Sequence, residues 1–225
     1  MSNAIDHHAG APAARAAPLV LTVAGLDNSG PGHWQTIWDQ ERSDCERVEL
    51  GMWSQPNRNA WVTALNSAIR QAGRPVILVA HSLGCLAVAW WAALEAQSYG
   101  TPVAGALLVA PPDVDTAGPD MRIAGFGPAP KVILPFPSVL IASTNDPFID
   151  IARAHSLAKF WGSHFVEIGE AGHINAEAGL GAWSQGQEWL DRLIGLVGSD
   201  GGKDDPLATA IIRPAANERS VLIDV

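Results

Sequence analysis

The sequence predicts an α/β fold: a three-layer sandwich in which about six parallel strands form a sheet with helices on both faces. Short apolar segments alternate with helical patterns along most of the 225 residues, and this alternation is typical of parallel sheets. The three central segments consist almost entirely of Val, Ile, Leu and Ala, as expected of strands buried on both faces. With 48% hydrophobic residues, the chain is long enough to bury a sizeable core.

Six segments are predicted to be strands because each is a short apolar run bounded by turn-forming or charged residues. In chain order the predicted strands are residues 19–25, 47–50, 76–81, 106–111, 138–143 and 165–169. Their carboxyl ends should meet at one edge of the sheet, which is where ligands bind in such folds.

Five helices are predicted between and after these strands. In the second, Trp61, Leu65 and Ile69 recur four residues apart and form one apolar stripe. The fourth is placed at Pro147, because proline suits the first position of a helix. The predicted helices are residues 32–42, 59–72, 83–97, a segment that starts at 147, and 184–197.

One domain is expected, over residues 18–197. Residues 1–17 are rich in Ala, Pro and His and are predicted to be disordered. Residues 198–225 open with the linker-like GSDGGKDDP and form a tail whose structure the sequence does not determine. Residues 112–137 form a long loop rich in Pro and Gly. Such loops are usually functional or mobile, and whether this one covers a site is left open.

Charge and hydropathy argue against several classes of partner. The formal net charge is −9, and the 14 Lys and Arg residues form no cluster, which argues against nucleic acid and against an anionic membrane surface. No secretory signal is visible. The longest apolar run, residues 83–94, is too short to span a bilayer. We therefore expect a soluble cytoplasmic protein with no membrane partner.

The cysteines give no sign of a metal site. Cys45 and Cys85 are the only two in the chain, and although they could form a bridge, nothing in the sequence requires one. A metal site would need more Cys or a tighter group of His, Cys and carboxylates than the sequence contains. We expect no metal and no organic cofactor.

The segment PVILVAHSLGC carries the strongest functional signal. Residues 80–84 read Ala-His-Ser-Leu-Gly and match the nucleophile elbow G-x-S-x-G, except that Ala80 replaces the first glycine. Short S-x-G matches are common by chance. This one follows a predicted strand and precedes a predicted helix, so Ser82 should stand on a sharp turn at the carboxyl edge of the sheet.

A serine needs a base and an acid to become a nucleophile. In folds with this elbow the order along the chain is Ser, acid, His. Asp146 follows the fifth predicted strand and His173 follows the last one. Ser82, Asp146 and His173 therefore fit a catalytic triad at one sheet edge.

Each of these residues also has a plainer interpretation. Ser82 and Asp146 could each be the N-cap of the helix that follows, and His173 could be an ordinary turn histidine. Asp113 and Asp115, which follow the fourth predicted strand, are alternative acids. The combination of residue types and order favours the triad.

An oxyanion hole and a pocket complete the predicted site. The backbone N–H of Leu83, next after the nucleophile, should be one oxyanion donor, and the N–H of Leu26, after the first strand, the other. The loop that carries Leu26 does not fit a dinucleotide fingerprint, because Gln35 stands where the third glycine belongs, and no Gly-Lys-Ser/Thr of a P-loop follows. Candidate pocket residues are His33, Trp34, Trp53, Phe136 and Ile174.

Six blocks of the sequence resemble the small α/β hydrolases of the retinoblastoma-binding-protein and YdeN-like serine hydrolase family. They are GHWQTIWDQE, VELGMWSQPNRNAWV, VAHSLGCLAVAWWA, LLVAPPDVD, LPFPSVLIASTNDPF and AGHINAEAGLGAW. The resemblance covers about residues 18–197 and implies an α/β-hydrolase-type sheet with strand order 2-1-3-4-5-6 and a minimal lid. It also implies that the family's triad falls on Ser82, Asp146 and His173.

One property of that family is not carried over. Its name suggests binding to a pocket protein through L-x-C-x-E, and the nearest match, residues 83–87, ends in Ala. This segment should also be buried behind the nucleophile.

These observations predict a serine hydrolase that cleaves a small carboxylic ester through an acyl-enzyme intermediate. A thioester or an amide remains open as the substrate bond, as do the natural substrate, the acyl-chain preference and the oligomeric state. The rival prediction is a non-catalytic binding protein on the same fold, because fold alone does not prove activity.

Overall fold

The structure, a computed structural model, describes residues 16–116 and 120–198. Six strands form one sheet in the order β2-β1-β3-β4-β5-β6, and every neighbouring pair is parallel. The strands are β1 (Leu19–Val23), β2 (Cys45–Arg47), β3 (Val76–His81), β4 (Val103–Val109), β5 (Ser138–Ala142) and β6 (His164–Glu167). The predicted fold class and strand order are confirmed.

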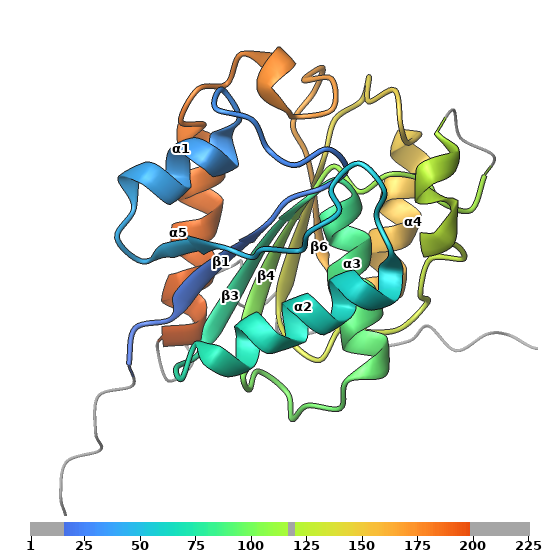
Figure 1. Cartoon of the computed structure of the whole chain (residues 1–225). Coiled ribbons are helices and arrows are strands. Elements are labelled where there is room, and N and C mark those ends of the chain that lie inside the picture. Colours follow the sequence, from blue (N-terminus) through green and yellow to red (C-terminus); the bar gives the residue numbers. More distant parts are fainter. Residues whose placement is uncertain (1–15, 117–119, 199–225) are drawn as a thin grey trace, which may run out of the picture.

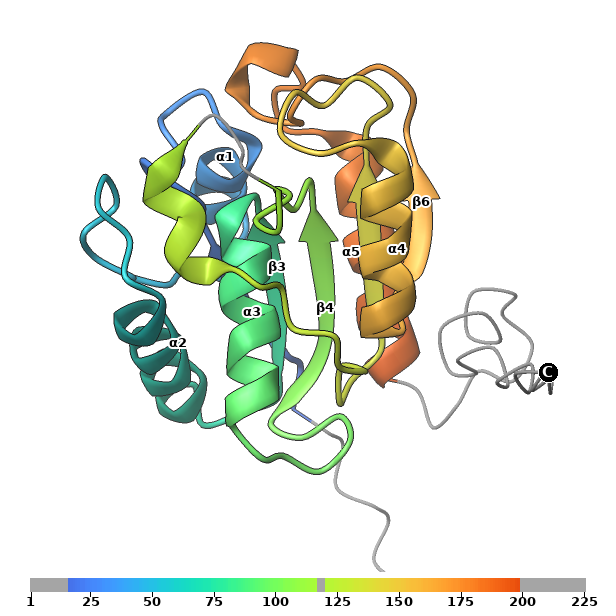
Figure 2. The same cartoon turned by 90° about the vertical axis from the view of Figure 1, so that its right-hand side faces the viewer.

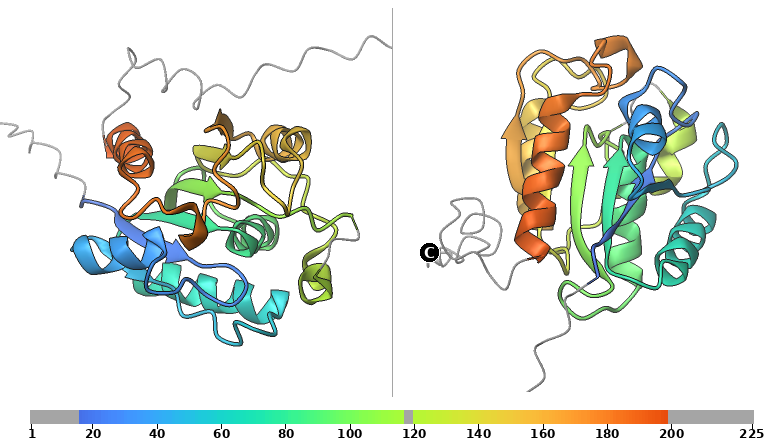
Figure 3. Two further views of the ribbon diagram at one scale, coloured as in Figure 1. Left: turned by 90° about the horizontal axis from the view of Figure 1, so that it is seen from above. Right: turned by 90° about the vertical axis from the view of Figure 1, so that its left-hand side faces the viewer.

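Helices cover both faces of this sheet (Figure 1). The helices α1 and α5 lie on one face, as the right-hand view of Figure 3 shows, and α2, α3 and α4 lie on the other. Two short 3₁₀ helices, η1 and η2, follow β4 and β6. The bounds are α1 (Trp34–Glu41), α2 (Arg58–Gln71), α3 (Leu83–Leu94), η1 (Met121–Phe126), α4 (Ile151–Trp161), η2 (Ala176–Ala178) and α5 (Ser184–Gly198).

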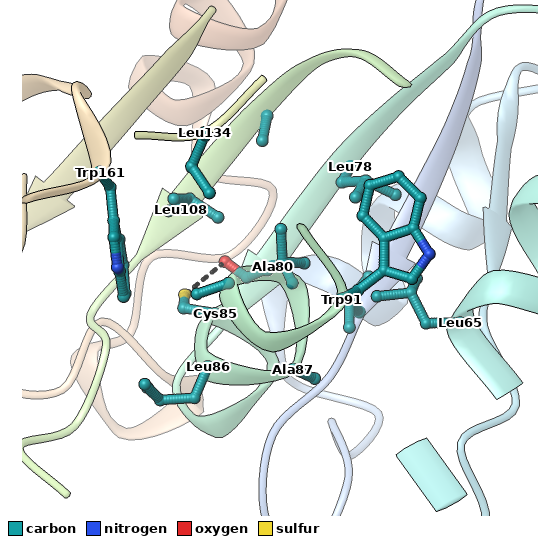
Figure 4. Close-up of a cluster of buried hydrophobic side chains, with 14 of the residues drawn as sticks. Leu65, Leu78, Ala80, Cys85, Leu86, Ala87, Trp91, Leu108, Leu134 and Trp161 are labelled. Carbon is teal, nitrogen blue, oxygen red and sulfur yellow. Dashed lines mark hydrogen bonds between the residues drawn. The ribbon is translucent and has the colours of Figure 1, made fainter. Parts of the chain in front are cut away.

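Alternation along the strands divides the core into two parts. In β3, Leu78 and Ala80 pack with residues of α2, α3 and α4, whereas Ile77 and Val79 pack with residues of α1 and α5. Because successive side chains of a strand point to opposite faces, one strand supplies both layers. Figure 4 shows residues of the first part, among them Leu65 of α2, Leu86 of α3 and Trp161 of α4.

The fourth helix begins later than predicted. Its N-cap is Asp150, whose carboxylate accepts the Ala152 amide at 2.8 Å, and the helix starts at Ile151. Pro147 lies in a turn instead, where the Asp146 carboxylate accepts the Phe148 amide at 2.9 Å. Proline suits the early position of a turn as well as that of a helix, so the sequence signal was ambiguous and the prediction was wrong by four residues.

The ends of several other strands and helices differ slightly from the predicted bounds. The second strand covers residues 45–47 rather than 47–50, because only Val20–Thr22 of β1 pair with it. The fourth strand starts and ends earlier than predicted, and α3 stops at Leu94, where Glu95 takes an extended conformation.

Parts of the predicted domain organisation lie outside the described residues. Residues 1–15 and 199–225 are among these, so disorder at the N-terminus stays a prediction, and the tail, for which the sequence predicts no structure, lies outside the described residues from position 199 on. The sheet and its helices occupy residues 19–198. Within the described ranges, the longest helix is α5 with 15 residues, and no helix there could cross a bilayer as an apolar span. Cys45 and Cys85 are both buried and unbridged.

Candidate active site

Ser82 stands on a strained turn between β3 and α3. Its backbone has φ 53° and ψ −127°, and its side chain makes no capping bond to the helix. A positive φ in a non-glycine residue is uncommon and unfavourable, so the surrounding structure must hold it. One such contact is the Ser82 amide, which donates to the Val109 carbonyl at 2.9 Å. The alternative that Ser82 caps α3 is wrong.

Two glycines let β1 approach this turn closely. A Cβ added at Gly84 would overlap the carbonyl oxygen of Val23, so only glycine allows the first turn of α3 to pack on the end of β1. A Cβ at Gly25 would lie 2.8 Å from the Ser82 Cβ and 3.1 Å from the Leu83 nitrogen. Glycine at these positions keeps the space beside Ser82 open.

Ser82, His173 and Asp146 form one hydrogen-bonded chain. The Ser82 Oγ lies 2.8 Å from His173 Nε2, and His173 Nδ1 lies 3.0 and 2.9 Å from the two Asp146 carboxylate oxygens. The Asp146 side chain is fully buried. A buried carboxylate facing Nδ1 holds the proton on that nitrogen, so Nε2 is left to accept the serine hydroxyl. The structure thus brings the three predicted triad residues together.

Several contacts fix the loop that carries His173. The Asn145 side-chain oxygen accepts the Gly172 amide at 2.7 Å, and Ser143 Oγ accepts the Ala171 amide at 2.9 Å. His81 places Nε2 2.9 Å from the His173 carbonyl. Phe148 packs edge-on against the His173 ring with centroids 4.5 Å apart. The imidazole is therefore oriented from both sides.

The alternative acids Asp113 and Asp115 form ion pairs away from the triad. Both bind the Arg153 guanidinium, each at 3.1 Å, and neither contacts His173. Burial alone would raise the pKa of Asp113, but hydrogen bonds from Arg153 and the Asp115 amide outweigh it and lower that pKa. This cluster anchors α4 to the loop after β4.

The predicted oxyanion donors lie beside Ser82. Within the described part of the chain, neither the Leu26 nor the Leu83 amide donates to a protein acceptor. Leu83 is the first residue of α3, where free N–H groups and the helix dipole favour negative charge. Leu26 lies in a turn closed by the Asn28 amide and the Gly25 carbonyl at 3.2 Å, with Asp27 at φ 60°.

The loop after β1 is anchored by a buried glutamine. The Gln35 amide donates to the carbonyls of Val23 and Val79 at 3.3 and 3.0 Å, and its oxygen accepts the Ser29 hydroxyl at 2.7 Å. These bonds join the loop to the ends of β1 and β3. Gln35 therefore helps to place Leu26 relative to Ser82.

Two buried histidines next to the triad stay neutral. Burial, with smaller contributions from Arg47 and His173, lowers the pKa of His33 to about 4, and burial also lowers the pKa of His81 well below its usual value. His33 is the N-cap of α1, where Nδ1 accepts the Gln35 amide at 3.1 Å. The rings of His33 and His81 are 4.6 Å apart.

The neutral His33 should make the protein less stable in mild acid. The unfolded chain protonates this residue near its ordinary pKa of 6.5, whereas the folded protein resists protonation to about pH 4. Protonation between these values favours the unfolded state, so the free energy of unfolding should fall by about 3 kcal/mol as pH drops from 6.5 to 4. Urea titrations across this range measure it.

The matched variant for this prediction is His33→Asn. Asparagine keeps a cap for the Gln35 amide but does not titrate, so its stability should fall less steeply over the same range. His81 would still contribute a fall in the same direction. If the free energy of unfolding fell equally steeply with pH in the wild type and in His33→Asn, His33 would not be buried and neutral in the folded protein.

A pocket of about 380 Å³ opens beside Ser82 and His173. Its volume suits a small ligand. Of the five predicted pocket residues, only His33 lines it. The other lining residues are Leu26, Asp27, Asn28, Gly30, His81, Pro112, Asp120, Arg122, Ile123, Phe148, Asn175, Ala176 and Glu177. The 112–137 segment therefore forms part of one wall through residues 112, 120, 122 and 123.

Two of the other predicted pocket residues are packed beneath the site. Trp34 is 1% exposed, packs at a tilt against Trp38 and Trp183, and donates its indole N–H to the Ile174 carbonyl at 2.8 Å. Ile174 is fully buried beside it. Both predictions were wrong because these side chains belong to the core between the sheet and α1.

The remaining two lie farther from the site. Trp53 packs on Trp61 at 5.6 Å, and only its carbonyl supports the site, by accepting the Asp27 amide. Phe136 lies two residues before the start of β5, and so at the opposite edge of the sheet, where it is 2% exposed and stacks near Trp91. Neither residue lines the pocket.

Some of the pocket residues that the sequence analysis did not predict had a signal in the sequence, and others had none. Phe148 is two residues from Asp146, and Asn175 and Glu177 are within four of His173, so closeness to the triad could have found them. Arg122 lies in the long loop, 40 residues from Ser82, and no pattern marked it. Among the described residues, no group of three or more His, Cys, Asp or Glu is arranged to hold a metal ion.

The family follows from the match of a family model to most of the sheet and its helices. The model described as serine hydrolase matches residues 20–192. The chain belongs to this serine hydrolase family. It is therefore an enzyme, a hydrolase, and the family resemblance predicted from the sequence is confirmed.

Solved structures agree with this assignment. The serine hydrolase is 33% identical to a protein described as a YdeN-like hydrolase from Pectobacterium atrosepticum, with a TM-score of 0.71, over 80% of this chain and 91% of that one. The ydeN gene product from B. subtilis is 19% identical, with a TM-score of 0.63, over 79% and 99%. A thermophilic esterase from Thermogutta terrifontis is 15% identical, with a TM-score of 0.55, over 78% and 90%. The last two show the fold alone. A comparison with proteins of curated function finds no significant match.

Proposed function

We propose that this serine hydrolase cleaves a small carboxylic ester through an acyl-enzyme intermediate on Ser82. The observation that carries the proposal is the hydrogen-bonded chain from Ser82 Oγ through His173 to Asp146, with distances of 2.8 Å and 2.9 Å. Nucleophile and base within hydrogen-bond reach, with a third group orienting the base, are what acyl transfer needs.

The first half of the reaction transfers the acyl group to the enzyme. Ser82 Oγ attacks the carbonyl carbon while His173 Nε2 takes the hydroxyl proton. Asp146 stabilises the imidazolium, and the Leu26 and Leu83 amides bind the oxyanion. The bond from the carbonyl carbon to the alcohol oxygen then breaks, and His173 gives its proton to the departing alcohol.

Water completes the cycle. His173 takes a proton from a water molecule as its oxygen attacks the acyl carbon, and the bond to Ser82 Oγ breaks as the proton passes to the serine. The carboxylic acid leaves and the enzyme is regenerated. The same atoms would act on a thioester or an amide, with sulfur or nitrogen as the leaving atom. A panel of leaving groups decides between them.

A fluorophosphonate probe tests this proposal directly. The wild type should be labelled on Ser82, as peptide mass spectrometry would show, and Ser82→Ala should not be labelled. The control is Ser67→Ala, an exposed serine on α2 outside the pocket, which should label like the wild type. Labelling of Ser82→Ala equal to the wild type would remove Ser82 from its role. If no p-nitrophenyl ester is turned over and no labelling occurs, the rival of a non-catalytic binding protein is favoured.

A further inference from the structure

Among the described residues, four side chains that are charged near pH 7 line the pocket, and we call them its rim. Asp27 comes from the loop after β1, Asp120 and Arg122 come from the start of η1, and Glu177 comes from η2. These three segments stand at the carboxyl end of the sheet, with η1 and η2 on different sides of it (Figure 2). Three carboxylates and one guanidinium therefore face whatever enters.

The one guanidinium is already paired. Arg122 Nη2 lies 2.6 Å from Asp120 Oδ2, and its Nε lies 3.0 Å from both Asp120 oxygens. Arg122 Nη1 lies 3.0 Å from Asp27 Oδ1. Because two carboxylates already bind its guanidinium, Arg122 has no pair of N–H groups left to bind a carboxylate of the substrate in a bidentate manner.

Glu177 adds a negative charge that this pair does not balance. It is exposed, and within the described part of the chain no cation lies within ion-pair distance of it. His33 and His81, two of the histidines that line the pocket, do not compensate, because burial lowers the pKa of both and keeps them neutral near pH 7. Arg47 does not line the pocket, and its guanidinium is paired with Asp39 at 2.7 Å.

From this arrangement we infer the charge class of the substrate. We propose that the pocket takes esters whose non-reacting part is neutral or cationic and disfavours esters that carry a free carboxylate. The inference rests on the proposed ester hydrolysis at Ser82. A rim of net negative charge lowers the local concentration of anions and repels a carboxylate at short range. The rim is exposed, so salt should weaken the preference.

The test compares three acetate esters of similar size. They are acetylcholine, its uncharged carbon isostere neohexyl acetate, and an acetylated hydroxybutanoate. For the wild type at low ionic strength, kcat/KM should fall in that order, with a cation-to-anion ratio of about tenfold that shrinks to about twofold in half-molar salt. A wild type that prefers the anionic ester would overturn the inference.

Two variants assign the preference to the rim. Glu177→Gln should narrow the cation-to-anion ratio, and Arg122→Gln should widen it, because the two Asp charges would then be unbalanced. The control is Glu95→Gln. Glu95 caps the far end of α3, about 18 Å from the elbow for a helix of 12 residues, and the ratio should not change. If Arg122→Gln narrows the ratio, the guanidinium does not act as described.

The outcomes separate this inference from the proposed function. If neohexyl acetate is hydrolysed and the three esters differ only by their intrinsic reactivity with hydroxide, the charge inference fails and the proposed function stands. If no ester is hydrolysed and the fluorophosphonate probe does not label Ser82, both fail.

Discussion

Ser82→Ala should lower kcat for an activated ester by about five orders of magnitude, and adding His173→Ala should lower it little further. The reason is that the serine and histidine act as one unit. Without the hydroxyl there is nothing for His173 Nε2 to deprotonate at 2.8 Å, and without the imidazole the hydroxyl is a weak nucleophile. Steady-state kinetics on p-nitrophenyl acetate would measure the two single variants, Ser82→Ala and His173→Ala, and the double variant.

The fold should survive these substitutions. Alanine at position 82 keeps the same strained φ of 53°, and the amide bond to Val109 does not involve the side chain. We expect melting temperatures close to the wild type, which excludes unfolding as the cause of lost activity. If the effects of the two substitutions instead multiplied, so that kcat of the double variant were far below that of either single variant, Ser82 and His173 would not belong to one relay.

The triad could be predicted from the sequence because the topology of the sheet determines which residues come together. Parallel strands end at one edge, so a serine after β3, an aspartate after β5 and a histidine after β6 must come near one another whatever the details of the loops. Gly25 and Gly84 are required for a similar reason, because β1 and the turn at Ser82 approach each other too closely for a Cβ at either position. These requirements are local and leave a readable pattern.

The walls of the pocket could not be derived in this way. They depend on contacts between distant residues, such as Arg122 with Asp27, which are 95 positions apart. Trp34 and Trp53 are predicted to line the pocket because they follow loops at the sheet edge. Trp34 is instead buried in the core on the face of the sheet that α1 and α5 cover. Whether an aromatic side chain points into a cavity or into the core depends on packing, and no local pattern records it. The predicted absence of a nucleic-acid partner stays a prediction.

Asp146→Asn should be the second most damaging change, with kcat falling about ten-thousand-fold and KM little altered. The structure gives a specific reason. Asp146 Oδ1 accepts the Phe148 amide at 2.9 Å, so the asparagine oxygen must take that place and its NH₂ group must face His173 Nδ1. An N–H donor there forces the proton of the imidazole onto Nε2, and Nε2 can then no longer accept the proton of Ser82.

The matched control for this change is Asp113→Asn. Asp113 is the alternative acid from the sequence, and it binds Arg153 at 3.1 Å rather than the triad, so its amide variant should keep kcat within a few-fold while losing some stability. Nitrogen NMR of the His173 ring separates the two effects, because it should report the proton on Nδ1 in Asp113→Asn and on Nε2 in Asp146→Asn. Similar losses of kcat in both variants, with the same ring tautomer, would mean that Asp146 does not orient the base. The buried carboxylate would then act only through packing and charge.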